Sequence, residues 1–184
     1  MNNNVVNKDK GFTLTELVVA LAVGAILLAL AIPPFSIMMK NNRMASTTNA
    51  MVAAVNLTRS EAIRRNARVT MCKSADGSDC TTDNAWDQGW IIFVDVNGNA
   101  IRDEGEELLR THDALGRGIT VSGSSDMANY LSYSPSGRSV RTNGAFLAGT
   151  LALCDDRGDD YARLLVLNRV GRLKLKPGEE DACP

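Results

Sequence analysis

The first apolar run of the chain is long, uncharged and close to the N-terminus. Residues 17–39 contain no charged side chain, and about 20 apolar residues suffice for a helix to cross a bilayer. Lys8 and Lys10 precede the run, but an ordinary signal peptide has a shorter apolar stretch, with its cleavage site after it. The pattern therefore predicts an apolar anchor helix. Pro33 and Pro34 predict a kink or local melting late in this helix.

After Lys40 the pattern becomes that of an amphipathic helix. Apolar residues recur at helical spacing while charged residues face elsewhere. The apolar positions are Met44, Met51, Val55 and Ala62, widened by Val52 and Ile63, and the charged ones are Arg43, Arg59, Glu61, Arg64 and Arg65. A single broken helix over residues 12–65 would be about 80 Å long at 1.5 Å per residue. Its second half is predicted to pack on a domain.

Beyond Asn66 short apolar or alternating runs are separated by Gly, Asn, Asp and Ser, which is typical of strands and turns. The predicted strands are residues 68–73, 90–96, 107–111, 119–122, 130–134, 138–141, 150–154, 163–168 and 172–176. The fold class is therefore predicted to be α+β, with a long N-terminal helix packed on a C-terminal β-rich head.

Composition argues against an enzyme. A chain of 184 residues fits one globular domain with an appendage. The formal net charge is -1, so any function driven by charge must be local. Because His112 is the single histidine, a histidine metal centre or a Ser-His-Asp triad is hard to assemble. We expect no enzymatic activity, no cofactor and no small-molecule substrate.

The four cysteines point to disulfides. They lack the CxxC spacing of zinc and redox sites, and disulfides persist outside the reducing cytosol. Three pairings are open on sequence grounds. We favour Cys72 with Cys80, which closes a short polar loop, and Cys154 with Cys183, which ties down a chain end that would otherwise fray.

A carboxylate opens the apolar helix. Glu16 would cost several kcal/mol if it entered lipid unpaired, so its position suggests a role. The stretch Lys10-Gly11-Phe12-Thr13-Leu14-Thr15-Glu16, followed by the apolar run, resembles the type IV prepilin signature. The resemblance implies that a prepilin peptidase cuts after Gly11, that the new terminal Phe12 is N-methylated, and that Glu16 neutralises the amino terminus of a neighbouring subunit.

These boundaries divide the chain into a leader over residues 1–11, a hydrophobic membrane or filament-core helix over 12–39 and a head over 40–184. The head comprises the amphipathic helix 40–65 and the β-sheet region 66–184. The implied location is the inner membrane, as a single-pass protein with its head in the periplasm, and then a cell-surface pilus or a periplasmic pseudopilus.

Short stretches of the head sharpen the resemblance. Residues 88–95 and 105–110, together with 133–138 and Gly171-Arg172, are similar to the heads of GspH pseudopilins and of FimU and FimT minor pilins. This implies a low-copy subunit that primes assembly at the tip of a type IV pilus through contacts with other minor and major pilins. The alternatives are a DNA-binding minor pilin for natural transformation and an H-type pseudopilin of a type II secretion system.

One loop has the oxygen ligands of a calcium site. Asp95, Asn97, Asn99, Asp103 and Glu106 occupy positions 1, 3, 5, 9 and 12 of a loop like that of an EF-hand. Ala100 stands where that loop needs glycine, and strands rather than helices are expected on both sides. The alternative is a polar hairpin connection, because Asn-Gly is a strong turn signal. We treat calcium as a weak candidate and expect no metal.

The last hairpin carries a basic stripe. Arg172, Lys174 and Lys176 alternate onto one face of the final predicted strand, and Arg169 lies just before it. FimT-like DNA-uptake pilins are similar here, with a Gly-Arg-x-Arg motif that holds phosphates. This chain has lysine at the last position of that motif, which keeps the charge but loses the fork of donors.

The alternative is a solvated edge strand, whose lysines discourage pairing with other sheets. Three acidic residues follow the stripe and dilute its field: Glu179, Glu180 and Asp181. DNA is therefore an alternative partner that we do not favour.

Overall fold

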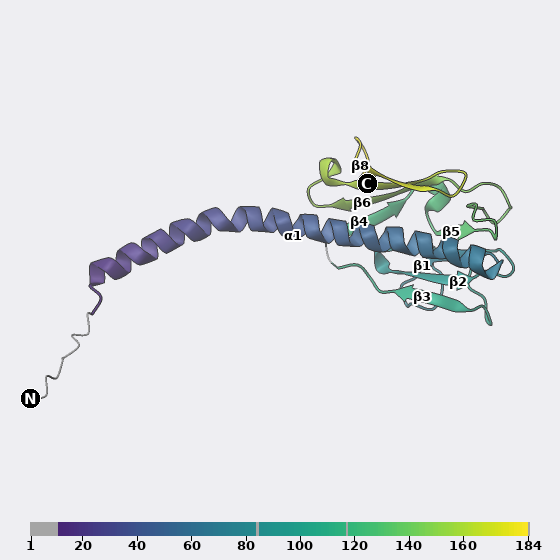
Figure 1. The fold of residues 1–184 in the computed structure, drawn as a ribbon, viewed down its shortest axis with the longest axis horizontal. Helices are drawn as coiled ribbons and strands as arrows, with labels where there is room; N and C mark the ends of the chain where they lie inside the picture. The colour runs from purple at the N-terminus through teal and green to yellow at the C-terminus, as the bar shows by residue number, and fades with distance from the viewer. Residues whose placement is uncertain (1–10, 84, 117, 184) are drawn as a thin grey trace, which may run out of the picture. The chain divides into compact units, whose positions relative to one another are not determined.

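The computed structural model describes residues 11–83, 85–116 and 118–183, without the side chains of 29–34 (Figure 1). The expected leader residues 1–10 lie outside the described residues. The chain forms two compact units, residues 1–42 and 43–184, and each is treated by itself below. The helix α1 (Leu14–Arg65) supplies residues to both units.

In the first unit α1 displays apolar side chains on all sides. Phe12 is 91% exposed, and the side chains of Leu14, Leu17, Leu21 and Leu28 are also exposed. Within the described residues, no helical stretch is sufficiently long and apolar to count as a membrane span.

Of the kink or local melting expected at the prolines of α1, the local melting is not present. The backbone is helical through Pro33 and Pro34, so the local melting predicted there is wrong. A helix tolerates prolines when the freed backbone groups are satisfied nearby. The side chains of these prolines lie outside the described residues.

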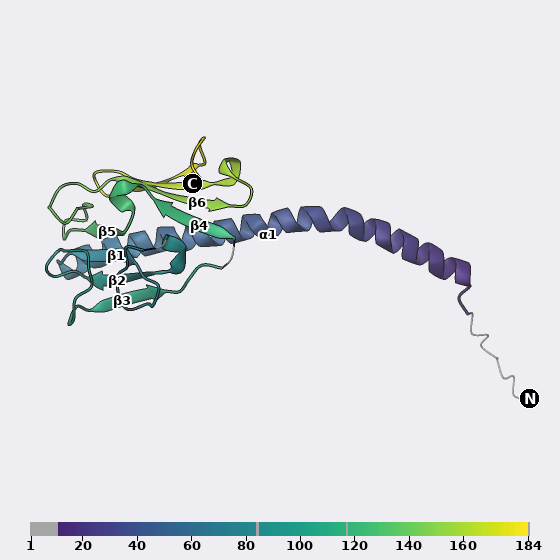
Figure 2. The ribbon, with the colours of Figure 1, turned by 180° about the vertical axis from the view of Figure 1, so that it is seen from behind.

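The second unit contains two antiparallel four-stranded sheets (Figures 1 and 2). The first has the order β3-β2-β1-β5, with bounds Leu108–His112, Trp90–Val94, Val69–Lys73 and Tyr130–Tyr133. The second has the order β4-β6-β7-β8, with bounds Ile119–Gly123, Gly149–Asp155, Arg163–Leu167 and Leu173–Pro177. Short 3-10 helices lie at Trp86–Gln88, Ser125–Met127 and Asp159–Tyr161.

One stripe of α1 enters the core of this unit. The buried positions follow the spacing of an amphipathic helix: Met44, Thr47, Thr48, Met51, Ala54, Val55, Thr58 and Ala62. The apolar side chains among them share one cluster with residues of both sheets, such as Met71 and Leu151. The helix therefore closes the space between the sheets. Ile63 was expected to widen the stripe, but its side chain is 53% exposed, because it lies one residue beyond the buried Ala62.

The buried threonines of the stripe are satisfied locally. The hydroxyl of Thr48 donates to the carbonyl of Met44 at 2.7 Å, and that of Thr58 donates to Ala54 at 2.8 Å. Burying a hydroxyl costs free energy only when it lacks a hydrogen-bond partner, so these threonines can lie in the apolar stripe of α1. The sequence periodicity had predicted only Met, Val, Ala and Ile for that stripe.

Eight of the nine predicted strands are present, with ends displaced by one or two residues. Residues 138–141 make only isolated bridges, at Tyr133↔Ser139 and Val140↔Phe146. Tight turns closed by Gly137 N donating to Ser134 O and Gly144 N donating to Arg141 O flank this segment, so too few residues remain for a ladder.

Candidate functional sites

The expected assembly residues meet at the start of α1. The backbone N–H of Thr13 donates to the Glu16 carboxylate at 2.9 Å, and the Thr13 hydroxyl donates to the same oxygen at 2.8 Å. The Glu16 N–H lies 3.3 Å from the Thr13 hydroxyl. This reciprocal arrangement is a capping box, which satisfies donors that a helix start leaves free. Gly11 and Phe12 are exposed just before it.

Thr13 is therefore a residue of this site that the sequence reasoning missed. The signal was present, because Thr followed three residues later by Glu, before an apolar run, is the capping-box pattern. The carboxylate of Glu16 is thus already held by its own chain, in an exposed position.

Two disulfides fix the head. The structure joins Cys72 to Cys80 and Cys154 to Cys183, which are the pairs favoured above. Cys72 packs with Ile91 and Phe93 on the face of the first sheet that points away from α1. Cys154 packs beside Leu164 on the corresponding face of the second sheet, where the tail residues Ala182 and Cys183 cover it.

The candidate calcium loop is closed by its own hydrogen bonds. Asp95, which is fully buried, accepts from the backbone of Gly98 at 2.7 Å and from the Thr70 hydroxyl at 2.7 Å. Glu106 accepts from the backbone N–H groups of Val96 and Asp103 at 2.8 and 3.0 Å. These carboxylates therefore shape the connection between β2 and β3.

The asparagine side chains of the same loop also make hydrogen bonds within it. The side chains of Asn97 and Asn99 both donate to Asp103, at 2.6 and 2.8 Å. Ala100 takes the left-handed conformation, with φ of 61°, at the place where an EF-hand has glycine. Across the described part of the chain, no group of three or more His, Cys, Asp or Glu is arranged to hold a metal.

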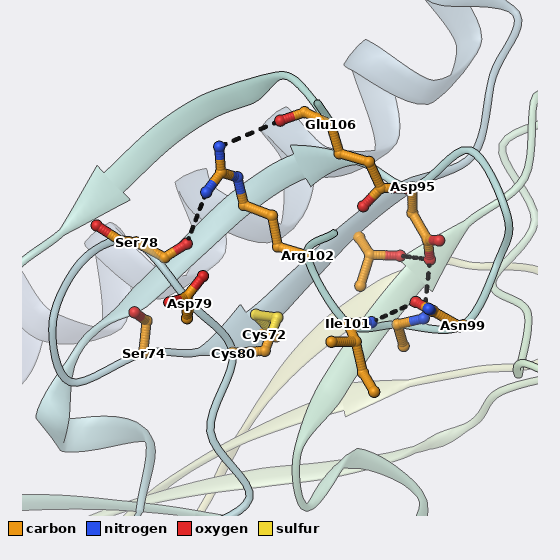
Figure 3. Close-up of a disulfide and its surroundings, with 12 residues drawn as sticks. Cys72, Ser74, Ser78, Asp79, Cys80, Asp95, Asn99, Ile101, Arg102 and Glu106 are labelled. Atoms are coloured by element: carbon orange, nitrogen blue, oxygen red, sulfur yellow. Dashed lines mark hydrogen bonds between the residues drawn. A yellow bond between two sulfur atoms is a disulfide. The ribbon is translucent and has the colours of Figure 1, made fainter. Parts of the chain in front are cut away.

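Arg102 connects this loop to the first disulfide loop (Figure 3). Its guanidinium donates to the carbonyl of Ser78 at 3.1 Å and to that of Glu106 at 3.2 Å. Ser78 lies between Cys72 and Cys80, so one arginine bridges the two polar loops at this side of the first sheet. This link could not be read from the sequence.

The four candidate DNA-binding residues are divided between β8 and the turn before it. Lys174 and Lys176 lie opposite Val166 and Leu164 on one face of β8, the edge strand. Lys176 lies 3.3 Å from Glu179. Arg172 precedes the strand, and Arg169 lines a separate cavity with Arg141 and Phe146, among others.

Asn168 shapes the turn that carries the two arginines. Its side-chain oxygen accepts from the backbone N–H groups of Val170 and Arg172 at 3.1 and 2.8 Å. Gly171 takes φ of 78°, which glycine adopts without strain. Arg169 and Arg172 thereby project from one tight turn and are both exposed.

Comparison with known proteins gives two family matches. The family described as "Type II transport protein GspH" matches residues 47–171, and the "Prokaryotic N-terminal methylation motif" matches residues 6–32. The "Pilin-like protein PilA1" of Thermus thermophilus is 36% identical over 114 residues, which are 61% of this chain and 65% of that relative. This chain therefore matches less than two thirds of the relative's length.

The fold is similar to that of solved minor pilins. Two crystal structures of the type IV minor pilin FimU of Pseudomonas aeruginosa give TM-scores of 0.57 and 0.53 at 20% identity. They cover 79% and 76% of this chain and 99% of each solved chain. Because the GspH match covers more than half of the residues, this chain belongs to the family described as type II transport protein GspH, which consists of structural proteins rather than enzymes.

Proposed function

We propose that the chain is a minor pilin of a type IV pilus, which helps to prime assembly at the tip through contacts with other minor pilins. The observation that carries this proposal is the exposed apolar surface of α1 in the first unit, where Phe12 and Leu14 are 91% and 80% exposed. A helix that is apolar all round needs lipid or other helices around it. A filament of packed pilin helices supplies such an environment.

The start of α1 supports the processing steps. The N-terminal methylation motif covers residues 6–32, and Gly11 and Phe12 are exposed ahead of the capping box. In the proposed sequence of events a prepilin peptidase cuts between them while the apolar helix is in the inner membrane and the head is in the periplasm. Methylation of Phe12 follows, and the subunit then enters the filament.

Glu16 has the proposed role of pairing with the terminal amine of a neighbouring subunit. Its carboxylate has two hydrogen bonds from Thr13, and a carboxylate oxygen can accept more than one donor. The capping box therefore holds the charge in place without using all of its acceptor capacity. A buried amine that met this carboxylate would be compensated rather than left unpaired.

Mass analysis of sheared filaments tests the assignment. The intact mass of the filament form should correspond to residues 12–184 with one methyl group on the N-terminal Phe12. Retention of residues 1–11 in assembled material would contradict the processing, and absence of the chain from filaments would contradict the proposed function.

The family description favours one second candidate, an H-type pseudopilin of a type II secretion system. Deletion of the chain separates the two functions. Lost piliation with normal secretion of exoproteins supports the pilus function, and lost secretion with normal piliation supports the pseudopilin.

A further inference from the structure

Two segments of the second unit are rich in positive charge. Residues 134–149 and 168–176 contain four arginines and two lysines but no Asp or Glu. The segments meet at the buried Ser139, whose hydroxyl donates to the carbonyl of Leu147 at 2.7 Å and lies 3.3 Å from the carbonyl of Asn168. The fold therefore brings the charge of both segments to one region.

A cavity of about 480 Å³ is lined by both segments and by the 3-10 helix before β5. We call it the arginine cavity, and its lining residues are Asp126, Arg141, Ala145, Phe146, Ala148 and Arg169. Among these described residues Asp126 alone is acidic, and it already forms an ion pair with Arg141. Arg141 also donates from Nε to the Phe146 carbonyl at 3.1 Å. The charges of Asp126 and Arg141 are thus compensated within the chain.

Two further arginines at the arginine cavity lack such compensation. Arg169 lines its wall, and the guanidinium of Arg138 lies over the Phe146 ring at 4.6 Å. Both arginines are exposed, and within the described part of the chain neither forms an ion pair. The Phe146 ring is itself 48% exposed. The cavity therefore presents two uncompensated cations beside an accessible aromatic ring.

The composition of this surface favours a protein partner over a nucleic acid. Arginine and aromatic side chains are enriched in protein interfaces and among the residues that contribute most to binding. Val170, which follows Arg169, is 59% exposed, and a nucleic-acid strand would gain nothing from covering it. Bases bind single-stranded sites by stacking on aromatic rings, but Arg138 already covers one face of Phe146.

The charge balance specifies what the partner must carry. A surface that covered Phe146 would also take Arg138 and Arg169 out of water. Removing a charge from water without a counter-charge is costly, whereas a guanidinium pairs with a carboxylate through two parallel hydrogen bonds. The partner therefore needs an Asp or Glu next to an apolar side chain.

We propose that the arginine cavity binds an exposed segment of another minor pilin, in which a carboxylate lies next to an apolar side chain. The carboxylate pairs with Arg138 and Arg169, and the apolar side chain covers Phe146 and Val170. The proposal rests on the function proposed above, in which this chain is a low-copy subunit that contacts different subunits. Complementary charge then helps to select the neighbour, because a surface without carboxylates leaves both arginines unpaired.

Zero-length carbodiimide cross-linking of assembled filaments tests the contact. The reagent joins an amine to a carboxylate, so an Arg169→Lys variant of the full chain places an amine at the arginine cavity and keeps the positive charge. Mass spectrometry of the linked peptides should show a link from position 169 to an Asp or Glu of a different minor pilin. The Lys176–Glu179 pair, at 3.3 Å, should link within each copy and so reports that the hairpin is folded.

Matched variants make the test specific. In the Arg169→Lys background, Phe146→Ala should lower the yield of this link by about tenfold or more, because the ring is the central apolar contact. Tyr161→Ala should leave the yield unchanged, although Tyr161 is 43% exposed and also lies under an arginine, Arg157, at 4.1 Å. Arg110→Lys, introduced instead of Arg169→Lys, puts an amine at an exposed position of β3 and should not link to the same peptide.

The results that would overturn the contact are distinguishable. Filaments that contain the chain and the Lys176–Glu179 link, but no link from position 169, exclude the contact and leave the proposed function intact. A link from position 169 to the major pilin or to a second copy of this chain excludes the proposed partner. Equal losses in Phe146→Ala and Tyr161→Ala exclude the cavity as the site. Absence of even the unsubstituted chain from filaments overturns the proposed function, and the contact with it.

Nucleic acid is tested separately with a single-stranded oligonucleotide. The full chain in detergent should bind it no more tightly than the Kd of about 10⁻⁴–10⁻⁶ M that is typical of non-specific binding, and Phe146→Ala should not change that value. Much tighter binding at physiological salt that Phe146→Ala abolishes would assign the cavity to DNA instead of a protein.

Discussion

Gly171 is the residue at which the turn between β7 and β8 depends most on the absence of a side chain. Its carbonyl accepts from the Tyr133 hydroxyl at 3.0 Å, and a Cβ would lie 2.8 Å from the Tyr133 ring. Burial raises the pKa of Tyr133 to about 12, against the opposing effect of Arg59. The hydroxyl therefore remains a donor at any physiological pH, and the turn is fixed from both sides.

Gly171→Ala should accordingly destabilise the protein by more than the cost of a left-handed alanine, which is about 1–2 kcal/mol. The added methyl group meets backbone and a buried ring, neither of which can move freely. Denaturant unfolding of the full chain in detergent measures the loss. Gly144→Ala is the matched control, because Gly144 has φ of 81° but open space around it. Equal losses in the two variants would contradict the steric argument.

Glu16 and Thr13 permit a second prediction at the residue scale. Glu16→Ala should abolish the capping box and the proposed pairing, so incorporation into filaments should fall while the head stays folded. Thr13→Val removes the hydroxyl but leaves the Glu16 charge, and it should cost only about 0.5–2 kcal/mol of helix-start stability. Counting each variant in sheared filaments separates the two roles. Normal incorporation of Glu16→Ala would argue against charge pairing.

Among the elements, the two disulfides close loops of different length, 8 and 29 residues. In the chain-entropy account, a disulfide that closes a longer loop stabilises the folded state more, because it removes more conformational entropy from the unfolded chain. Replacing Cys154 and Cys183 by alanine should therefore destabilise the head by about 1 kcal/mol more than replacing Cys72 and Cys80. Chemical denaturation of both variants gives the comparison. A larger loss for the short loop would show that its link to Arg102 outweighs chain entropy.

The disulfide pairing can be tested directly on the purified protein. Non-reducing peptide mapping should recover Cys72 with Cys80 and Cys154 with Cys183. A peptide that joins Cys72 to Cys183 would contradict it, because Cys72 lies in the first sheet whereas Cys183 lies in the tail that packs against the second sheet.

For the whole molecule, the separated charges predict weak binding to DNA. Arg172 and Lys174 are exposed, but Lys176 is paired with Glu179, and the exposed acids Glu180 and Asp181 follow soon after β8. Non-specific binding should have a Kd of about 10⁻⁴–10⁻⁶ M and weaken with salt. An anisotropy titration at two salt concentrations measures it, with Arg172→Ala and Lys174→Ala as variants and Lys176→Ala as the control.

The DNA-uptake function would be favoured by the opposite outcome. Tight binding at physiological salt that Arg172→Ala and Lys174→Ala abolish, together with normal piliation of both variants, would make the protein a DNA receptor.

Local sequence patterns were sufficient to predict most of the helix and strand positions. The helical seam through Met44, Met51 and Val55 and eight strands follow from periodicity, because burial on one side of an element imposes its own repeat on the sequence. The family resemblance followed from the prepilin signature and short head motifs. The segment 138–141 has strand composition yet lies between two turns, and no local pattern shows that a ladder has no room.

The tertiary structure alone decided which side chains meet across the chain. The sequence determined that Asp95 and Glu106 are acidic, but only the closed loop shows that backbone amides occupy them. The sequence places Arg59 and Gly171 more than a hundred residues apart, and folding brings both of them to Tyr133. The physical reason is range: helix and strand formation depend on nearby residues, whereas charge patches depend on which loops the packed core brings together.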